Sequence, residues 1–246
     1  MSARRERYLE EMGLAPVWKL RREPAIHEAE PRAPEPEARM QEQALAPATS
    51  GLLDDRTARI LRMEWPELKS AVAGCQACSL SKTRKNTVFG VGDERADWLL
   101  VGEAPGAEED ARGEPFVGQA GRLLDNMLAA IDLKRGENVY ICNVLKCRPP
   151  GNRNPEPFEV AQCGPHLLRQ LALIKPKLIL AMGRFAVQSL LETDASIASL
   201  RGKLHRYQGV PLVVTYHPAY LLRNLPDKAK AWEDLCFARR TIAGLQ

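Results

Sequence analysis

The sequence predicts an α/β protein with three layers, α/β/α, in which helices cover both faces of a central, mainly parallel four-stranded sheet. Two observations predict this fold class. Between residues 98 and 243, short apolar runs alternate with segments whose apolar residues have helical spacing. Alternating strands and helices imply parallel strands joined by crossover helices, and such sheets are covered on both faces. Hydrophobic residues make up 45% of the 246 residues, enough for one sizeable core.

The predicted elements follow one another in a regular order. Short apolar runs predict strands at 98–101, 139–144, 178–181 and 212–215. Helical spacing predicts helices at 119–133, 155–174 and 227–243, and a short one after Gly183. An additional helix is expected to begin at the capping residues 54–57 and to run toward Ala73. Because ligands bind beyond the carboxyl ends of parallel strands, the loops after the first, second and fourth strands are the places to look for a site.

The folded domain is predicted to follow a tail. We expect a short helical segment at residues 1–22, a disordered linker at 23–53 and the folded domain at 54–246. The linker carries five prolines and almost no large apolar residues. An inert spacer is the simpler interpretation of the tail, and a docking peptide for a protein partner at residues 1–20 is the alternative.

Charge and the start of the chain narrow the class of protein. Residues 1–50 carry a net charge of −1 and residues 51–246 a net charge of +5, which is compatible with a phosphate partner but does not require one. The first residues are charged and form no signal peptide, and no apolar run is long enough to cross a membrane. We therefore expect a cytoplasmic monomer with no membrane association.

Four of the six cysteines have a spacing that suits a metal centre. Cys75 and Cys78 form a CxxC pair before the first strand, and Cys147 and Cys163 follow the second strand. In a cytosolic protein, structural disulfides are rare. Three interpretations remain open for these residues: unrelated core residues, a structural zinc site, or a [4Fe–4S] ligand set. Cys142, within a strand, and Cys236, on a helix, are better explained as small buried hydrophobes.

The loops after the strands carry polar and aromatic side chains. The first strand runs into a tight turn with one carboxylate, Glu103, and Phe116 follows in a loop where it is either a stacking platform for a base or a core plug. Asn143 at the end of the second strand offers a donor and an acceptor that complement the N3–H and O4 of uracil, or it simply caps a loop. His217 follows the fourth strand, where a single histidine is often structural. Because it shares the sheet edge with Glu103 and Asn143, a functional role is favoured.

Basic and apolar residues near these loops are typical of a DNA contact. Lys146, Arg148 and Arg153 give the second loop a positive charge suited to phosphates. Leu221 and Leu222 are adjacent in an otherwise polar turn, where they are expected to wedge into a stack of bases.

These residues resemble the family 4 uracil-DNA glycosylases, the iron–sulfur type found in bacteria and archaea. The resemblance covers about residues 70–240 and rests on the four cysteines and five ordered stretches: Gly102–Gly106, Gly113–Asp125, Asn143–Pro149, Asn152–Pro155 and His217–Arg223. It implies the uracil-DNA glycosylase fold and hydrolysis of the N-glycosidic bond of a flipped-out deoxyuridine, which releases uracil and leaves an abasic site for base excision repair. The implied enzyme is a monofunctional DNA glycosylase, and its implied partner is DNA that contains uracil.

The resemblance also implies a role for each matching residue. Cys75, Cys78, Cys147 and Cys163 fall on the ligands of a [4Fe–4S] cluster with a structural role. Glu103 falls where a carboxylate or amide handles the attacking water, Asn143 on the base reader and His217 on the histidine that bonds uracil O2. Phe116 falls on the residue that stacks on uracil, and Glu109 falls beside uracil C5. Apart from the resemblance, we expect Ala104 to contact the substrate, and Lys146, Arg148, Leu221, Leu222 and Arg223 to contact DNA.

Two departures narrow the family further. No arginine-rich insertion of the kind that marks a variant trapping uracil covalently follows Cys147, so ordinary hydrolysis is expected. Glu103 argues against the family 5 enzymes, whose equivalent loop lacks a carboxylate. Three alternatives stay open: an enzyme for other deaminated bases such as hypoxanthine or xanthine, a non-catalytic DNA-binding module stabilised by metal, and a polymerase-associated adaptor that uses residues 1–20.

Overall fold

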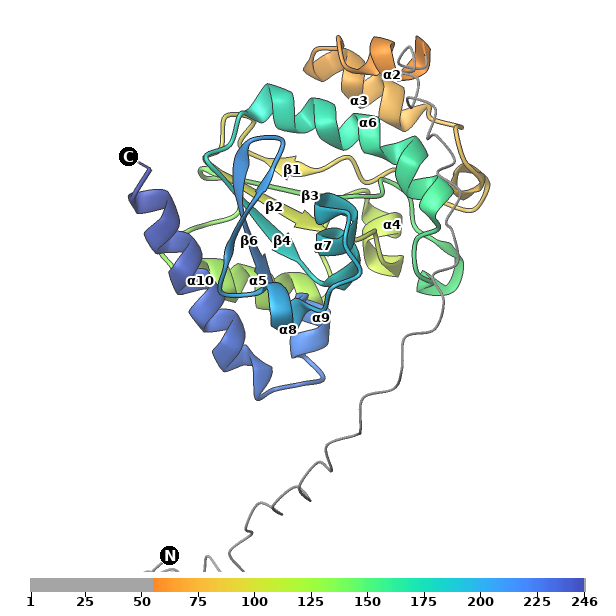
Figure 1. Ribbon diagram of the computed structural model, residues 1–246. Coiled ribbons are helices and arrows are strands. Elements are labelled where there is room, and N and C mark those ends of the chain that lie inside the picture. Colours follow the sequence, from red (N-terminus) through yellow and green to blue (C-terminus); the bar gives the residue numbers. More distant parts are fainter. Residues whose placement is uncertain (1–54, 246) are drawn as a thin grey trace, which may run out of the picture. The chain divides into compact units, whose positions relative to one another are not determined.

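A computed structural model describes residues 55–245, and these residues form a six-stranded sheet between two layers of helices (Figure 1). The strand order is β1-β3-β2-β4-β6-β5. The strands are β1 (Val91–Gly92), β2 (Trp98–Gly102), β3 (Val139–Asn143), β4 (Leu178–Met182), β5 (Leu204–Tyr207) and β6 (Val210–Thr215). The four central strands β3, β2, β4 and β6 are parallel, and β1 and β5 pair antiparallel at the two edges.

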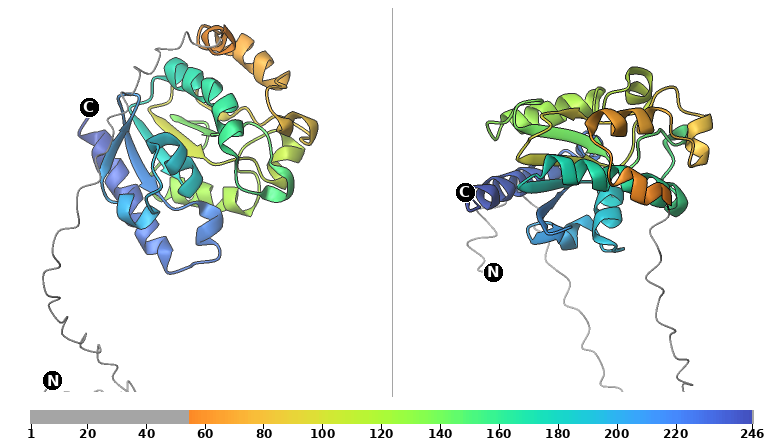
Figure 2. Two further views of the ribbon diagram at one scale, coloured as in Figure 1. Left: turned by 45° about the vertical axis from the view of Figure 1, so that its right-hand side comes forward. Right: turned by 90° about the horizontal axis from the view of Figure 1, so that it is seen from above.

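The helices divide between the two faces of the sheet (Figure 2). One face packs against α5 (Gln119–Ala129), α9 (Pro218–Leu221) and α10 (Asp227–Ala243). The other packs against α6 (Pro157–Ile174), α7 (Arg184–Leu191) and α8 (Ile197–Leu200). The remaining elements are α2 (Asp55–Ile60), α3 (Trp65–Ala73), α4 (Ala107–Arg112) and the 3₁₀ turns η1 (Ser79–Lys82) and η2 (Pro150–Asn152).

Alternate residues of each central strand supply the two cores. Leu100 of β2 faces the α5/α10 side, whereas its neighbours Leu99 and Val101 face the α6/α7 side. Every residue of β2, β3 and β4 is buried, which is the pattern expected of parallel strands covered on both faces. The three-layer α/β/α prediction and the four parallel strands are therefore confirmed.

Register brings the carboxyl ends of these strands to one edge. Gly102 at the end of β2 pairs with Asn143 at the end of β3. Met182 at the end of β4 pairs with Thr215 at the end of β6. The loops that leave all four central strands therefore start side by side.

The sequence prediction missed elements that lack a continuous apolar run. Strands β1 and β5 were not predicted, because β1 has two half-buried residues and β5 alternates exposed with half-buried ones. The single helix expected toward Ala73 is two helices, α2 and α3. Glu64 and Glu67 form a capping box that starts α3, and Pro66 in its first turn has no N–H to continue an earlier helix. The helices α4, α8 and α9 are short and were also not predicted.

The predictions for residues 1–22 and 23–53 lie outside the described residues, as do Asp54 and Gln246. Within residues 55–245, no helix is long and apolar enough to cross a membrane.

Candidate active site and cysteine cavity

The predicted polar residues gather in one cavity at the carboxyl edge of the sheet. This cavity, the substrate cavity, has a volume of about 860 Å³ and is lined by Glu103, Asn143 and His217 together with Phe116. Glu103 follows β2, Asn143 ends β3 and His217 follows β6. More than a hundred residues separate Glu103 from His217, yet the parallel strands bring them to one place.

Asn143 lies against Gly102 of the neighbouring strand. The side chain is 2% exposed, and its Oδ1 has no hydrogen-bond partner among the described residues. A Cβ on Gly102 would lie 2.4 Å from this oxygen and 2.7 Å from the ring of Phe116. Glycine is therefore required at position 102, because any side chain would displace both groups. A buried acceptor without a donor is costly, so this amide is held ready for a partner from outside the chain.

His217 is held as a neutral imidazole. Its Nδ1 accepts the backbone N–H of Ala219 at 3.1 Å, so the proton of the neutral ring lies on Nε2. Burial lowers the pKa of His217 to about 4, although the charge of Glu109 acts in the opposite direction. The ring stacks on Phe116 with centroids 5.4 Å apart and planes 28° apart. His217 therefore offers one N–H donor at neutral pH and carries no charge.

Glu103 is a half-buried carboxyl group with an unusual affinity for its proton. Burial raises the pKa of Glu103 to about 7, and the positive charge of Arg184 limits this rise. At neutral pH the group exists in both protonation states, which is the range in which a carboxylate accepts a proton from water effectively. Arg184 begins α7 directly after β4, so the third parallel strand also contributes to the cavity.

The loop that carries Phe116 is fixed by contacts from elsewhere in the chain. Phe116 has a φ of 55°, in the left-handed region that non-glycine residues rarely adopt. Arg135 donates to the carbonyl oxygens of Pro115 and Phe116 at 2.9 Å each. A Cβ on Gly121 would lie 1.8 Å from the carbonyl oxygen of Phe116, so the first turn of α5 also supports this loop. The ring is 6% exposed and lines the cavity.

Glu109 connects two loops of the substrate cavity. Its carboxylate accepts the backbone N–H groups of Gly106, Val117 and Gly118 at 3.0–3.2 Å. These bonds join the turn after β2 to the Phe116 loop. Glu109 lines the cavity, but all three bonds use its carboxylate as a brace for the backbone. Ala104 lines the same cavity and packs on the side where the cysteines lie.

The structure corrects two of the predicted DNA contacts. Lys146 is 1% exposed, so its ammonium cannot meet a phosphate on the surface. Leu221 is 1% exposed and belongs to the core between α9 and the sheet. Its neighbour Leu222 is 39% exposed and remains available as a wedge. Helix α9 explains this difference in exposure. Leu221 is the last residue of the helix and faces inward, whereas Leu222 lies just beyond its end.

The other predicted contacts lie at or near the surface. Arg223 is exposed and lines the substrate cavity. Arg148 is half-buried and donates to Asn152 Oδ1 at 2.8 Å. Arg153 lines the cavity but pairs with the buried carboxylate of Glu159 at 2.6 and 2.9 Å. Part of its charge is therefore already balanced.

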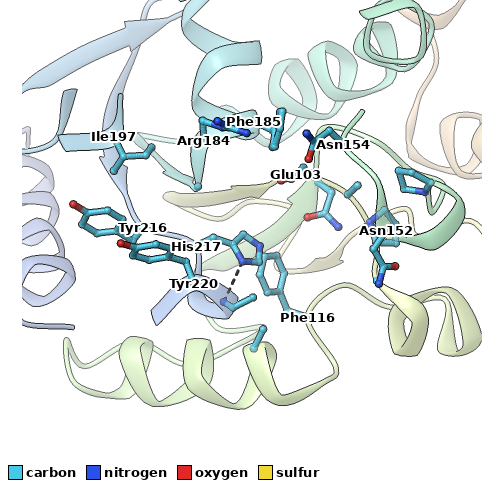
Figure 3. Close-up of a pocket in the computed structure, with 18 of the residues that line it drawn as sticks. Glu103, Phe116, Asn152, Asn154, Arg184, Phe185, Ile197, Tyr216, His217 and Tyr220 are labelled. Carbon is cyan, nitrogen blue, oxygen red and sulfur yellow. Dashed lines mark hydrogen bonds between the residues drawn. The ribbon is translucent and has the colours of Figure 1, made fainter. Parts of the chain in front are cut away.

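Sequence reasoning did not assign roles to several other residues that line the cavity. Figure 3 shows His217 and Phe116 in the middle, with Asn152 on one side and Tyr216 and Tyr220 on the other. The two tyrosine rings stack with centroids 5.2 Å apart. These tyrosines and Asn152 lie in or next to stretches that carried the family resemblance, which was the available signal. Arg135, which braces the Phe116 loop, lies in no such stretch.

A second, small cavity collects the four cysteines of the predicted metal centre. Cys75, Cys78, Cys147 and Cys163 line it, and its volume is about 10 Å³. The four residues come from three separate segments: the loop after α3, the loop after β3 and the first half of α6. Cys142 is fully buried in β3, in line with the prediction of a small hydrophobe. We call this second site the cysteine cavity.

Comparison with known proteins identifies the family. The model of the uracil DNA glycosylase superfamily matches residues 89–236. The type-4 uracil-DNA glycosylase of Archaeoglobus fulgidus is 49% identical over 159 residues, covering 61% of this chain and 79% of that protein. The type-4 enzyme of Pyrobaculum aerophilum is 40% identical over 183 residues, covering 70% and 92%. The chain belongs to the type-4 uracil-DNA glycosylases. A type-5 enzyme of P. aerophilum is 31% identical over 151 residues, covering 54% of this chain and 66% of that protein. This identity is lower than that of the two type-4 enzymes, in agreement with the expectation from Glu103 that the chain is not a family 5 enzyme.

Membership makes the chain a uracil-DNA glycosylase, a hydrolase of DNA repair, and places it in the iron–sulfur type of the superfamily. The resemblance seen in the sequence is therefore confirmed. The type-4 family is the iron–sulfur type, and the residues around the cysteine cavity bear on whether this chain fits such a cluster.

The chemistry around the cysteines fits a negatively charged thiolate centre. Arg84 Nη1 donates to Cys147 Sγ at 3.1 Å, and the backbone N–H of Lys146 donates to Cys163 Sγ at 3.3 Å. Hydrogen bonds and positive charges directed at sulfur stabilise bound thiolates. Burial raises the pKa of Cys163 to about 12, so this thiol needs a bound metal in order to be a thiolate at neutral pH.

The cysteine segments are nevertheless packed closely. The cavity volume is that of about one water molecule. Within residues 55–245, no three His, Cys, Asp or Glu side chains form a group arranged to hold a single metal ion. The fit therefore rests on the convergence of four thiols and on the cations that face them.

Proposed function

We propose that the substrate cavity removes uracil from DNA with Phe116, Asn143, His217 and Glu103 in distinct roles. Uracil-DNA glycosylase activity follows from the family, and the assignment of residues rests on their convergence. The observation that carries the assignment is that a carboxyl group, an amide and a neutral imidazole from three strand ends line one cavity with an aromatic ring. These groups complement a pyrimidine base and the water that replaces it.

Recognition of the base is assigned to Asn143 and Phe116. A flipped-out uracil offers an N3–H donor, which the Oδ1 of Asn143 can accept, and an O4 acceptor, to which the amide nitrogen can donate. The absence of a partner for Oδ1 among the described residues supports this role. Cytosine offers the reverse pattern and would leave both groups unpaired. Phe116 supplies a flat apolar surface for the ring.

Bond cleavage is assigned to His217 and Glu103. Breaking the C1′–N1 bond leaves its electron pair on uracil and a positive charge on the sugar. The Nε2–H of His217 stabilises the negative charge that develops at uracil O2, and a neutral donor does this without first giving up its proton. Glu103 orients a water for attack on C1′ and accepts its proton. The hydroxyl ends on the sugar, and a proton ends on uracil.

The four cysteines of the cysteine cavity are proposed to hold a [4Fe–4S] cluster. When bound, such a cluster crosslinks the loop after α3, the loop after β3 and helix α6, and it takes no part in bond cleavage. The contacts of Arg84 and Lys146 with sulfur atoms support this proposal. An absorption band at about 400 nm distinguishes an iron–sulfur cluster from zinc, which is colourless there.

Three variants test the assignment of the substrate cavity. Removing one donor to a developing negative charge costs about 10²–10³ in rate, so His217→Ala should lose this much in kcat. Asn143→Ala should lose about 10–100-fold, because two hydrogen bonds to the base disappear. Glu103→Ala should lose about 10²–10⁴-fold. Uracil release is measured from a 5′-labelled oligonucleotide with one deoxyuridine, followed by alkaline cleavage.

A matched control separates the cavity from general effects. His205→Ala removes an imidazole on the edge strand β5, which does not line the cavity, and should retain the wild-type rate. Wild-type rates for Glu103→Ala, Asn143→Ala and His217→Ala together would refute the assignment. Oligonucleotides that carry hypoxanthine or xanthine should not be cleaved, because Asn143 complements uracil; efficient cleavage of either would favour an enzyme for other deaminated bases.

A further inference from the structure

Lys146 is the largest side chain in the described residues with less than 2% of its surface exposed. It lines the cysteine cavity and lies directly before Cys147 and three residues after Asn143, which lines the substrate cavity. Its Nζ donates to the backbone carbonyl oxygen of Asn143 at 2.7 Å. Its backbone N–H donates to Cys163 Sγ at 3.3 Å. One residue therefore contacts both the strand end that carries the amide and a cysteine of the proposed cluster.

The ammonium of Lys146 has no carboxylate partner in the part of the chain that the structure describes. None of the ion pairs within 4 Å among residues 55–245 includes Lys146. Its positive charge instead acts on the thiols of Cys142 and Cys163 and on His166. An unpaired buried ammonium costs several kcal/mol, so a negative charge nearby is needed to keep it there.

The other two cations near the cysteines differ from Lys146 in their access to water. Arg84 contacts Cys147 Sγ at 3.1 Å, and Arg56 contacts Cys75 Sγ at 3.6 Å. Both side chains are partly exposed, so water can balance part of their charge. Of these three cations, only Lys146 is closed off from water, so the negative charge that balances its ammonium must come from inside the protein.

We propose that Lys146 is a positioning residue, which uses the negative charge of the thiolate centre to hold the end of β3 in place. The proposal rests on the cluster and on the role given to Asn143 above. With four thiolates bound to iron, the centre is an anion, and the Lys146 ammonium is attracted to it. The same ammonium fixes the carbonyl oxygen of Asn143, so the cluster helps to aim the amide that reads the base.

The backbone around Asn143 explains how one hydrogen bond can affect the substrate cavity. Val144 N–H donates to the carbonyl oxygen of Gly102 at 2.9 Å, and Leu145 N–H donates to that of Glu103 at 3.0 Å. The segment 143–147 therefore runs beside the turn that carries Glu103. A shift at its Lys146 end would move Asn143 and Glu103 relative to each other.

The test compares Lys146→Met with the wild-type holoenzyme in two independent measurements. The first is the lifetime of the absorption band at about 400 nm in the presence of a chelator, which should shorten about tenfold or more. The second is steady-state kinetics on uracil-containing DNA, in which kcat should fall about tenfold with KM unchanged, because the contacts to the DNA backbone remain. A purely structural role would not separate kcat from KM.

Lys82→Met is the matched control. Lys82 is exposed in η1, four residues after Cys78. The substitution therefore removes one positive charge near the cysteines without changing a buried site. It should match the wild type in both measurements. If Lys146→Met also matches the wild type in both, the proposal is overturned.

Two further variants keep the proposal testable if Lys146→Met does not fold. Lys146→Arg retains the charge and should keep the cluster lifetime within about twofold of wild type, whereas Lys146→Gln should shorten it. Equal lifetimes for these two variants would refute a role for the charge. Failure of the underlying proposals is distinguishable: a wild type without the absorption band refutes the cluster, and wild-type kinetics in Asn143→Ala refute the role of the amide.

Discussion

The substrate cavity and the cysteine cavity differ in what holds their groups in place. In the substrate cavity, the orienting contacts come from the chain itself: Ala219 bonds the ring of His217, and Arg135 bonds the loop of Phe116. In the cysteine cavity, the guanidinium of Arg84 and the backbone N–H of Lys146 donate to sulfur atoms. The first site is thus organised before its substrate arrives, while the groups around the second suit the negative charge of the cluster proposed for it.

The two cavities also differ in their effect on stability. Burial of Glu103 and the unpartnered Oδ1 of Asn143 both cost stability, and both groups are proposed to act on the substrate. The cysteines join three segments and are expected to add stability. Replacing a cysteine should therefore lower the stability of the protein, whereas replacing Glu103 should raise it at neutral pH. The first and last of the three predictions below test this difference, and the second tests the edge of the substrate cavity.

The largest effect is expected for Cys163→Ser. The variant should lose the absorption band at about 400 nm and unfold at a temperature lower by about 10 °C or more, because a bound metal centre contributes its binding energy to folding. Iron analysis, absorption and thermal denaturation measure this. Cys236→Ser provides the same substitution on α10, outside the cysteine cavity, and should keep both the iron and the melting temperature. Retention of a full iron complement by Cys163→Ser would contradict the ligand assignment.

A second prediction separates the two adjacent leucines at the edge of the substrate cavity. Leu221→Ala should destabilise the protein by about 2–5 kcal/mol, because it leaves a hole beneath α9. Leu222→Ala should change the free energy of unfolding by less than about 0.5 kcal/mol. It should lower kcat/KM on duplex DNA more than on single-stranded DNA, because only the duplex must be opened. Chemical denaturation and kinetics on both substrates measure this, and an equal loss on the two substrates would rule out a wedge.

The sequence was sufficient to predict the parallel strands and the groups at their ends. Glu103, Asn143 and His217 are each next to a buried apolar run, so the topology of a parallel sheet brought them together. It was insufficient for Lys146 and Leu221, because a residue in a loop or short helix can face either inward or outward. A lysine in a basic stretch is usually solvated, and only the packing of the loop after β3 beside the cysteines revealed that this one is buried. The brace from Arg135 to the Phe116 loop likewise depends on tertiary structure alone.

The smallest effect, and one of opposite sign to that of the cysteines, is expected for Glu103→Gln. The pKa of Glu103 is about 7 in the folded state, above its ordinary value of 4.5, so between these values the folded state binds more protons than the unfolded state. Stability in the wild type is therefore lost as the pH rises from about 4.5 to 7. Glutamine does not titrate, so the variant should melt at the wild-type temperature near pH 4.5 and about 2–4 °C above it at pH 8. The increase in melting temperature is limited because Glu103 is partly exposed to water.

The same substitution should lower the rate of uracil release, since glutamine cannot accept a proton from water. Glu114 is an exposed carboxylate two residues before Phe116, and Glu114→Gln should change neither the melting temperature nor the rate. A Glu103→Gln variant whose melting temperature differs from that of the wild type by the same amount at both pH values would show that the carboxyl group imposes no ionisation cost. In that case the substrate cavity and the cysteine cavity would not differ in the sign of their contribution to stability, and the burial of Glu103 would need another explanation.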